Sequence, residues 1–184
     1  STTRPSRSFG SVSRVSRSCA KRMLASGAIL GVVAGLALGR SWRPLAEARV
    51  RWLALLIAAV VARGVAPLVP PVAFPLYVLA LAGTTASAAA NVRLTGAAFV
   101  ALGGALNLAV VLVNHGMPVD PGALAVAAAA MPSDALQVRV TGTTMLVDLA
   151  DVIPVGVAHA VYSVGDFCIA VGGFVVPFVL LIRR

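Results

Sequence analysis

Charged residues, and acids above all, are scarce in this 184-residue chain. Only 11% of the residues are charged, with six acids against 15 Lys and Arg, while 59% are hydrophobic. The mean hydropathy of +0.96 lies well outside the range of soluble globular domains. The composition therefore predicts a membrane protein rather than a water-soluble domain.

Aromatic residues and cysteines are also few. Aromatic residues make up 5% of the chain. A platform for RNA or single-stranded DNA interleaves basic with aromatic side chains, so the net charge of +9 does not indicate nucleic-acid binding. The two cysteines are Cys19, in the polar N-terminal segment, and Cys168, in the last apolar run. They are not expected to pair, and no thiolate metal site is predicted.

The basic residues cluster beside apolar runs. All but three of the 15 lie in residues 1–22, in the loop 40–51 or at the last two positions. Lys and Arg beside apolar runs set the topology of membrane helices. Residues 1–22 have many serines and no acid, which predicts a disordered tail or a processed extension. Because the first apolar run starts at Met23, these residues are alternatively an over-called extension. Residues 23–184 are expected to form a single transmembrane domain.

Five apolar runs predict about five transmembrane helices. A helix needs about 20 apolar residues to cross the hydrocarbon core. The runs cover residues 23–39, 52–69, 72–90, 94–113 and 167–182. The predicted fold class is all-α and integral to the membrane, with a polar, partly helical outer segment at 114–165. Within this segment, 123–131 and 145–152 are expected to form short interfacial or re-entrant helices.

The arginines predict the orientation of these helices. Five spans place the loop 40–51, Arg93, Arg183 and Arg184 on one side, which the positive-inside rule assigns to the cytoplasm. The expected location is a bacterial inner membrane, with the C-terminus in the cytoplasm. Arg63, near the far end of the second span, is expected to extend its side chain to the headgroups.

The first span carries a glycine at every fourth position. On a helix this spacing places the glycines on one face, where another backbone is able to approach closely. Such a glycine zipper serves either packing within the chain or dimerisation, and the sequence leaves both open. The expected helix-packing residues are Gly27, Gly31, Gly35, Gly39 and, on the fourth span, Asn107.

Polar residues of the outer segment form a candidate site. Ser163 and Asp166 have the spacing of a capping box for the last helix. Ionisable groups near a bilayer are costly, which makes them candidates for an ion, proton or headgroup site. On a helix, Asp148 and Asp151 would share one face and hold a proton or cation, with a histidine completing a relay. The candidate polar site comprises Asn114, His115, Asp148, Asp151, His159 and Asp166.

No catalytic residue, cofactor or metal site is predicted. His115 and His159 lie too far apart for a zinc-ligand spacing. A Gly-x-Ser-x-Gly elbow, a phosphate-binding loop and a His-Glu-x-x-His motif are all missing from the sequence.

The order of motifs resembles that of a bacterial membrane family. The motifs are Asn107 and Asn114 followed by Gly-Met-Pro-Val, Leu-Ala-Asp-Val-Ile-Pro at 149–154, and Ser-Val-Gly-Asp at 163–166. From Met23 onwards the chain is similar to the domain of unknown function fifty-three-seventeen. It departs at His115, where the family pattern has Gly-Gly-Arg before Met-Pro. The family has no established activity, so the resemblance implies fold and membrane location alone.

Three functions are therefore carried forward. The first is an accessory or scaffold protein that packs through its glycine faces. The second is a small cation- or proton-coupled transporter that uses the outer-side carboxylates. The third, an outer-leaflet membrane enzyme or lipid-binding protein, has the least support. The expected partners are the lipid bilayer and either other membrane subunits or a second copy of the chain, and not nucleic acid.

Overall fold

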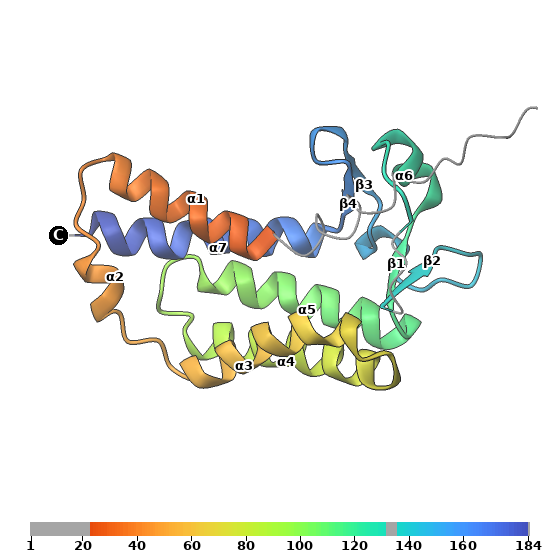
Figure 1. Ribbon diagram of the computed structural model, residues 1–184, viewed down its shortest axis with the longest axis horizontal. Helices are drawn as coiled ribbons and strands as arrows, with labels where there is room; N and C mark the ends of the chain where they lie inside the picture. Colours follow the sequence, from red (N-terminus) through yellow and green to blue (C-terminus); the bar gives the residue numbers. More distant parts are fainter. Residues whose placement is uncertain (1–22, 132–135, 184) are drawn as a thin grey trace, which may run out of the picture.

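The computed structural model describes residues 23–131 and 136–183. Residues 1–22, for which a tail was predicted, lie outside the described residues. Long helices lie side by side along the longest axis of the molecule (Figure 1). They are α1 (Met23–Ala37), α3 (Leu53–Val65), α4 (Ala73–Ala90), α5 (Ala97–Asn114) and α7 (Val164–Ile182).

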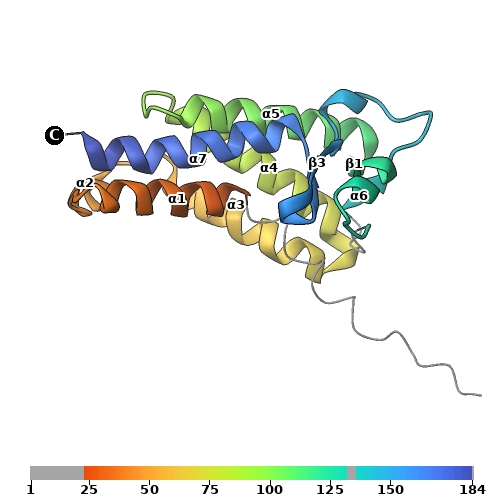
Figure 2. The same ribbon diagram turned by 90° about the horizontal axis from the view of Figure 1, so that it is seen from above.

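The helices pack in a series that differs from their order in the chain. The helix α1 packs against α7, α7 against α5, α5 against α4, and α4 against α3. In both views of the ribbon α1 runs alongside α7 (Figure 2). The first and the last helices of the bundle are thus adjacent, and α1 and α3 stand at the two ends of the series.

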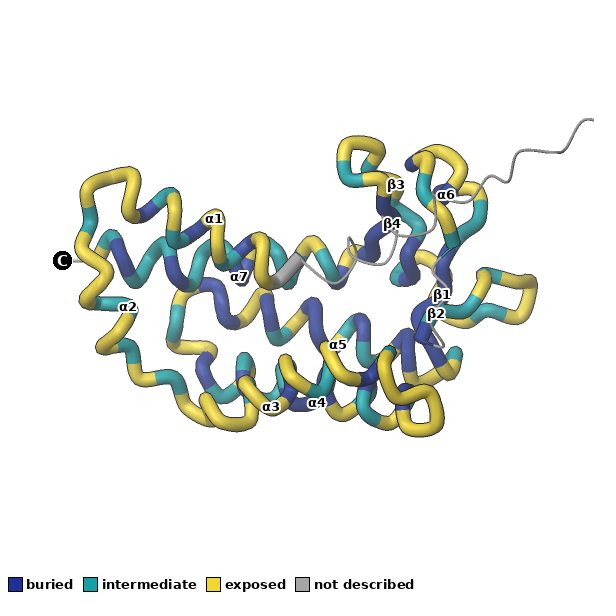
Figure 3. Tube along the Cα trace, viewed as in Figure 1, coloured by how far each residue is buried: buried dark blue, intermediate teal, exposed yellow. Residues whose placement is uncertain are grey.

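Three helices within the described residues are long and apolar enough to cross a membrane. They cover Pro70–Ala90, Ala97–Asn114 and Val164–Ile182, while the apolar helices at Ala25–Ala37 and Leu53–Leu68 are shorter. Many large apolar side chains point outward, including Ile29, Ile57 and Leu79, all more than half exposed. Much of α3 is exposed (Figure 3). These surfaces indicate a membrane protein, because lipid and not water solvates apolar side chains well.

The contact between α1 and α7 depends on glycines. A Cβ atom added at Gly27 or Gly31 would collide with the backbone carbonyl of Ala170 or Phe174 on α7, and one at Gly35 would collide with the side chain of Leu181. Gly39 is not part of this face. It lies beyond the end of α1 with a φ of +70°, and a Cβ there would meet nothing within 4 Å.

The two ends of the bundle differ in character. One end carries α2 (Arg43–Glu47), the turn at 91–96 and the end of α7 (Figure 1). The arginines of these segments and their flanks are Arg40, Arg43, Arg49, Arg51, Arg93 and Arg183. The other end carries the segment 115–163, which holds most of the acids.

Strands in the segment 115–163 correct the all-α prediction. β1 (Met117–Val119) pairs in parallel with β2 (Gln137–Arg139), and β3 (Ile153–Val155) pairs antiparallel with β4 (Ala160–Tyr162). The prediction of a helix over 123–131 was too long, since α6 covers Pro121–Val126.

The helix predicted over 145–152 was wrong. Only Val147–Leu149 forms a short 3₁₀ turn there, and Asp151 instead joins β1 through a bridge to Val119. The amide of Asp151 donates to the carbonyl of Pro118 over 2.9 Å, and the amide of Asp120 donates to the carbonyl of Asp151 over 3.0 Å. These bonds join residues far apart in the chain, and they override the local helix preference of the sequence.

Candidate functional site

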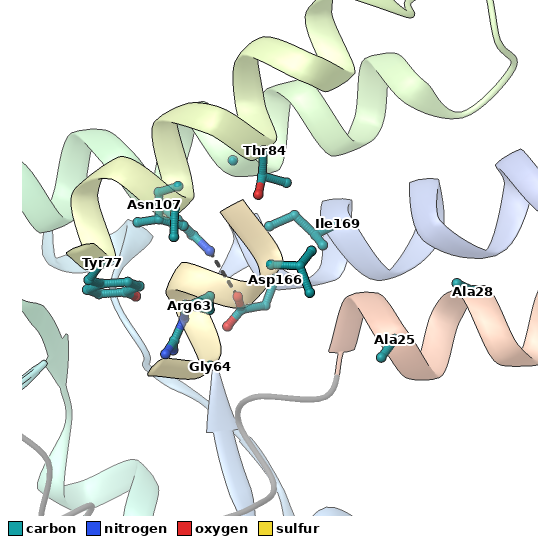
Figure 4. A pocket seen from close by; sticks show the side chains of 13 residues that line it. Ala25, Ala28, Arg63, Gly64, Tyr77, Thr84, Asn107, Asp166 and Ile169 are labelled. Atoms are coloured by element: carbon teal, nitrogen blue, oxygen red, sulfur yellow. Dashed lines mark hydrogen bonds between the residues drawn. The ribbon is translucent and has the colours of Figure 1, made fainter. Parts of the chain in front are cut away.

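A half-open cavity of about 510 Å³ lies between the helices, lined by residues of α1, α3, α4, α5 and α7. Most of its lining is small or apolar. The polar side chains in its wall are Arg63, Tyr77, Thr84, Asn107 and Asp166 (Figure 4). An apolar cavity with a few convergent polar groups is the usual form of a small-molecule site.

The polar wall is built on the N-terminus of α7. Ser163 caps this helix: its Oγ accepts from the amide of Asp166 over 3.0 Å, and the Asp166 carboxylate accepts from the amide of Ser163 over 3.2 Å. The predicted capping box is therefore confirmed. It adds a turn to the predicted last helix, which begins at Val164 rather than at Phe167.

Asn107 connects this cap to α5. Its Nδ2 donates to Asp166 Oδ1 over 2.9 Å (Figure 4), and its Oδ1 accepts from the Ser163 hydroxyl over 2.9 Å. The approach of the two helices requires Gly103 and Gly165, because a Cβ on Gly165 would overlap the Asn107 amide and one on Gly103 would overlap the Gly165 carbonyl. The Asp166 carboxylate is thus fixed in place by hydrogen bonds from both helices.

Arg63 lies on α3, in another part of the cavity wall. Its guanidinium lies over the ring of Tyr77, with 4.4 Å between Cζ and the ring centroid. The Nη1 atom is buried and has no hydrogen-bond partner. The prediction that this side chain extends to the headgroups was therefore wrong, because the tyrosine ring holds it against the bundle through a cation–π contact.

Asp151 is the second carboxylate of this region, and it is buried, whereas Asp166 is half-buried. Its side chain is 4% exposed, and its Oδ1 has no hydrogen-bond partner. Burial raises the pKa of Asp151 well above its ordinary value of 3.8; the charge of Asp166 raises it further, and that of Arg63 acts in the opposite direction. Asp151 therefore lies close enough to both residues to be coupled to them electrostatically.

The other members of the predicted polar site lie apart from this group. Asp148 is exposed on the 3₁₀ turn and shares no helix with Asp151. His115 is exposed, ends α5 with a φ of 57°, and stacks on Phe74 at 5.7 Å between ring centroids. His159 is exposed with a φ of 46°. The structure brings neither histidine to Asp151 or Asp166.

Asn114 has a structural contact instead. Its side-chain amide forms two hydrogen bonds with the peptide groups of Met145, from Nδ2 to the carbonyl and from the Met145 amide to Oδ1, each over 2.9 Å. A third bond runs from Nδ2 to the carbonyl of Val110 over 2.9 Å. Asn114 thus fixes the segment 115–163 to the end of α5.

Arg63, Tyr77 and Thr84 are site residues that sequence reasoning missed. The one available signal was Arg63, an unpaired charge inside an apolar run, which by default marks a functional position. Nothing in the sequence paired it with Tyr77. Within the described residues no group of three His, Cys, Asp or Glu side chains is placed to hold a metal ion.

The fold and the cavity define a helical protein of membrane type with a largely apolar cavity between its helices, into whose wall a few polar side chains are set. A family model described as "Family of unknown function (DUF5317)" matches residues 47–178. The chain belongs to this family, which the motifs at 107–119, 149–154 and 163–166 had indicated. The match includes the polar cavity residues, whereas α1 with its glycines lies before it. No curated protein and no solved structure matches the chain.

Proposed function

We propose that this is a polytopic protein of the bacterial inner membrane that binds a small molecule in its central cavity, as a small transporter or carrier does. The observation that carries the proposal is the convergence of Arg63, Asn107 and Asp166 on one largely apolar cavity. A small number of polar groups in an apolar lining is typical of a small-molecule site.

The proposal includes five membrane spans, of which α1 and α3 are the two shorter apolar helices. The helix α1, with 15 residues, is about 22 Å long, which is shorter than a typical hydrocarbon core of about 30 Å. Local thinning of the bilayer accommodates such a mismatch at modest cost. The arginines near α2, in the turn at 91–96 and after α7 would then lie together in the cytoplasm, and so would the C-terminus.

The scaffold hypothesis has less support. Gly27, Gly31 and Gly35 are buried against α7 of the same chain, so this glycine face is already occupied. The outer-leaflet enzyme hypothesis relied on His115 and His159, which are exposed and apart from the carboxylates. A cation or proton path remains a second candidate, favoured by the unpartnered Oδ1 of the buried Asp151.

Filling the cavity tests the proposal. Ala28 lines the cavity from α1, whereas the neighbouring Ile29 is 61% exposed on the outside of the same helix. Native mass spectrometry of the full chain in mild detergent is expected to detect a bound small molecule. Ala28→Phe should lose it and Ile29→Phe should retain it. A ligand-free wild-type protein, or equal retention by both variants, would contradict the proposal.

A further inference from the structure

The cavity holds two opposite fixed charges on different helices. Arg63 projects from α3 beside Tyr77, and Asp166 projects from the first turn of α7 (Figure 4). The Asp166 carboxylate accepts hydrogen bonds from Asn107 and from the Ser163 amide, and the N-terminus of α7 stabilises its negative charge. The guanidinium of Arg63 supplies the positive charge.

These charges select among ligand classes. A purely anionic ligand would be attracted by Arg63 and repelled by the carboxylate of Asp166. A purely cationic ligand would be attracted by Asp166 and repelled by Arg63. Either would leave net charge in a region of low dielectric, which is costly. A ligand that carries both signs has a partner for each and adds no net charge.

The rest of the cavity suits an apolar neighbour to such a group. Ala25 and Ala28 of α1 and Val60 of α3 contribute apolar lining, and α1 and α3 are the two ends of the helix series. The volume of about 510 Å³ is within the usual range for small-molecule sites, and exceeds what a single ion requires.

We infer that the cavity binds a zwitterionic group, in which an ammonium faces Asp166 and a phosphate or carboxylate pairs with the guanidinium of Arg63. This inference rests on the proposed function and names its ligand class. The same chemistry is present in the headgroup of a zwitterionic lipid and in a free zwitterionic solute.

The test compares three probes on the purified full chain. Phosphatidylethanolamine and phosphatidylglycerol with identical acyl chains differ in the ammonium, and glycerophosphoethanolamine carries the zwitterion without acyl chains. Native mass spectrometry is expected to show at least about tenfold preference for phosphatidylethanolamine over phosphatidylglycerol, the scale of one lost buried charge contact. Competition by glycerophosphoethanolamine would identify a free solute, and binding of the lipid alone would identify a lipid.

Two variants separate the charges. Arg63→Gln is expected to weaken phosphatidylethanolamine binding at least about tenfold, and Arg93→Gln, at an exposed site on the turn at 91–96, should leave it unchanged. Asp166→Asn keeps an acceptor for the Ser163 amide and should bring the two lipids to equal affinity. Since Asp166 also caps α7 and Arg63 packs on the Tyr77 ring, folding of both variants is checked by circular dichroism.

Equal binding of the two lipids by the wild-type protein, or a stronger binding of phosphatidylglycerol, would overturn the inference that the ligand is zwitterionic. So would failure of both ethanolamine probes to bind. In each case a ligand that Ala28→Phe loses and Ile29→Phe retains would still support the proposed function, so the two failures are distinguishable.

Discussion

The side chain of Asn91, at the end of α4, holds the peptide groups of Arg51, just before α3. The amide of Arg51 donates to Asn91 Oδ1 over 2.8 Å, and Asn91 Nδ2 donates to the Arg51 carbonyl over 2.7 Å. Nδ2 also donates to the Ser87 carbonyl over 2.7 Å. Asn114 makes the equivalent three bonds at the end of α5, so one asparagine secures a loop at each end of the bundle.

Loss of the Asn91 contact should destabilise the junction between α3 and α4. Asn91→Ala removes three hydrogen bonds, and we expect the free energy of unfolding to fall by about 2–3 kcal/mol. Unfolding of the purified protein by sodium dodecyl sulfate measures this loss of stability. The control is Thr95→Ala, which removes a single exposed hydrogen bond from Arg183. We expect it to lower the free energy of unfolding by less than about 0.5 kcal/mol. Equal losses in the two variants would contradict this role.

The packing of α1 on α7 should be sensitive to one methyl group. Gly31→Ala places a Cβ against the Phe174 carbonyl, so we expect a loss of about 1–3 kcal/mol in the same unfolding assay. Gly64→Ala is the matched control, because a Cβ there meets nothing within 4 Å and alanine favours the α3 helix. It should gain about 0.5–1 kcal/mol. A stable Gly31→Ala protein would show that the helices do not approach so closely.

The network of Asn107, Ser163 and Asp166 should behave as a unit. Ser163→Ala removes the cap of α7 and should cost about 1 kcal/mol. Asn107→Ala removes the donor to Asp166 Oδ1 and the acceptor for the buried Ser163 hydroxyl, and should cost more, about 2–3 kcal/mol. Because the residues share partners, the double variant should lose less than the sum of the single losses. Additive losses in this double-mutant cycle would rule out a coupled network.

Stability should fall as the pH rises, and Asp151 should be the cause. Burial and the charge of Asp166 raise the pKa of Asp151 in the folded protein, so the folded state binds the proton more tightly than the unfolded state. Stability is then greatest below the ordinary pKa of 3.8 and declines as the pH rises from there through the raised folded value. Asp151→Asn should reduce this decline in the free energy of unfolding measured across pH.

Asp148→Asn is the control for this pH dependence. Asp148 lies three positions earlier, and its side chain is exposed, so its neutralisation should leave the decline in place. A pH profile that Asp151→Asn leaves unaltered would assign the decline to another group.

The orientation of the bundle can be measured with two cysteines. Val157 is 97% exposed in the segment 115–163, and Val92 is 56% exposed in the turn at 91–96. In a variant with both native cysteines replaced by alanine, a membrane-impermeant maleimide added to intact cells should label Val157→Cys. It should label Val92→Cys only after the membrane is opened. The reverse pattern would invert the proposed topology.

The sequence predicted the helices better than their contacts. The runs at 72–90 and 94–113 lie within three residues of the bounds of α4 and α5, because a long apolar run with few charges has few alternatives to a helix. The segment 115–163 was predicted less well. Its strands are three residues long, and β1 pairs with β2 across α6, which no local pattern records.

The candidate site was predicted only in part. Asp151 and Asp166 were named from the cost of ionisable groups near a bilayer, and the structure places both in one region. Asn107 was predicted as a helix-packing residue instead, and it donates a hydrogen bond to Asp166. The other ionisable residues of the predicted set, Asp148, His115 and His159, are exposed. Composition does not distinguish a buried loop residue from a solvated one.

The sequence by itself determined the apolar helices, the gathering of arginines beside them and the cap of α7, because each depends on residues close together in the chain. Only the tertiary structure decided that α7 covers the α1 glycines and that Arg63 and Asp166 line one cavity. Those relations join residues more than a hundred positions apart. Their physical cause is the close packing of helices, and the sequence alone does not show which helix packs against which.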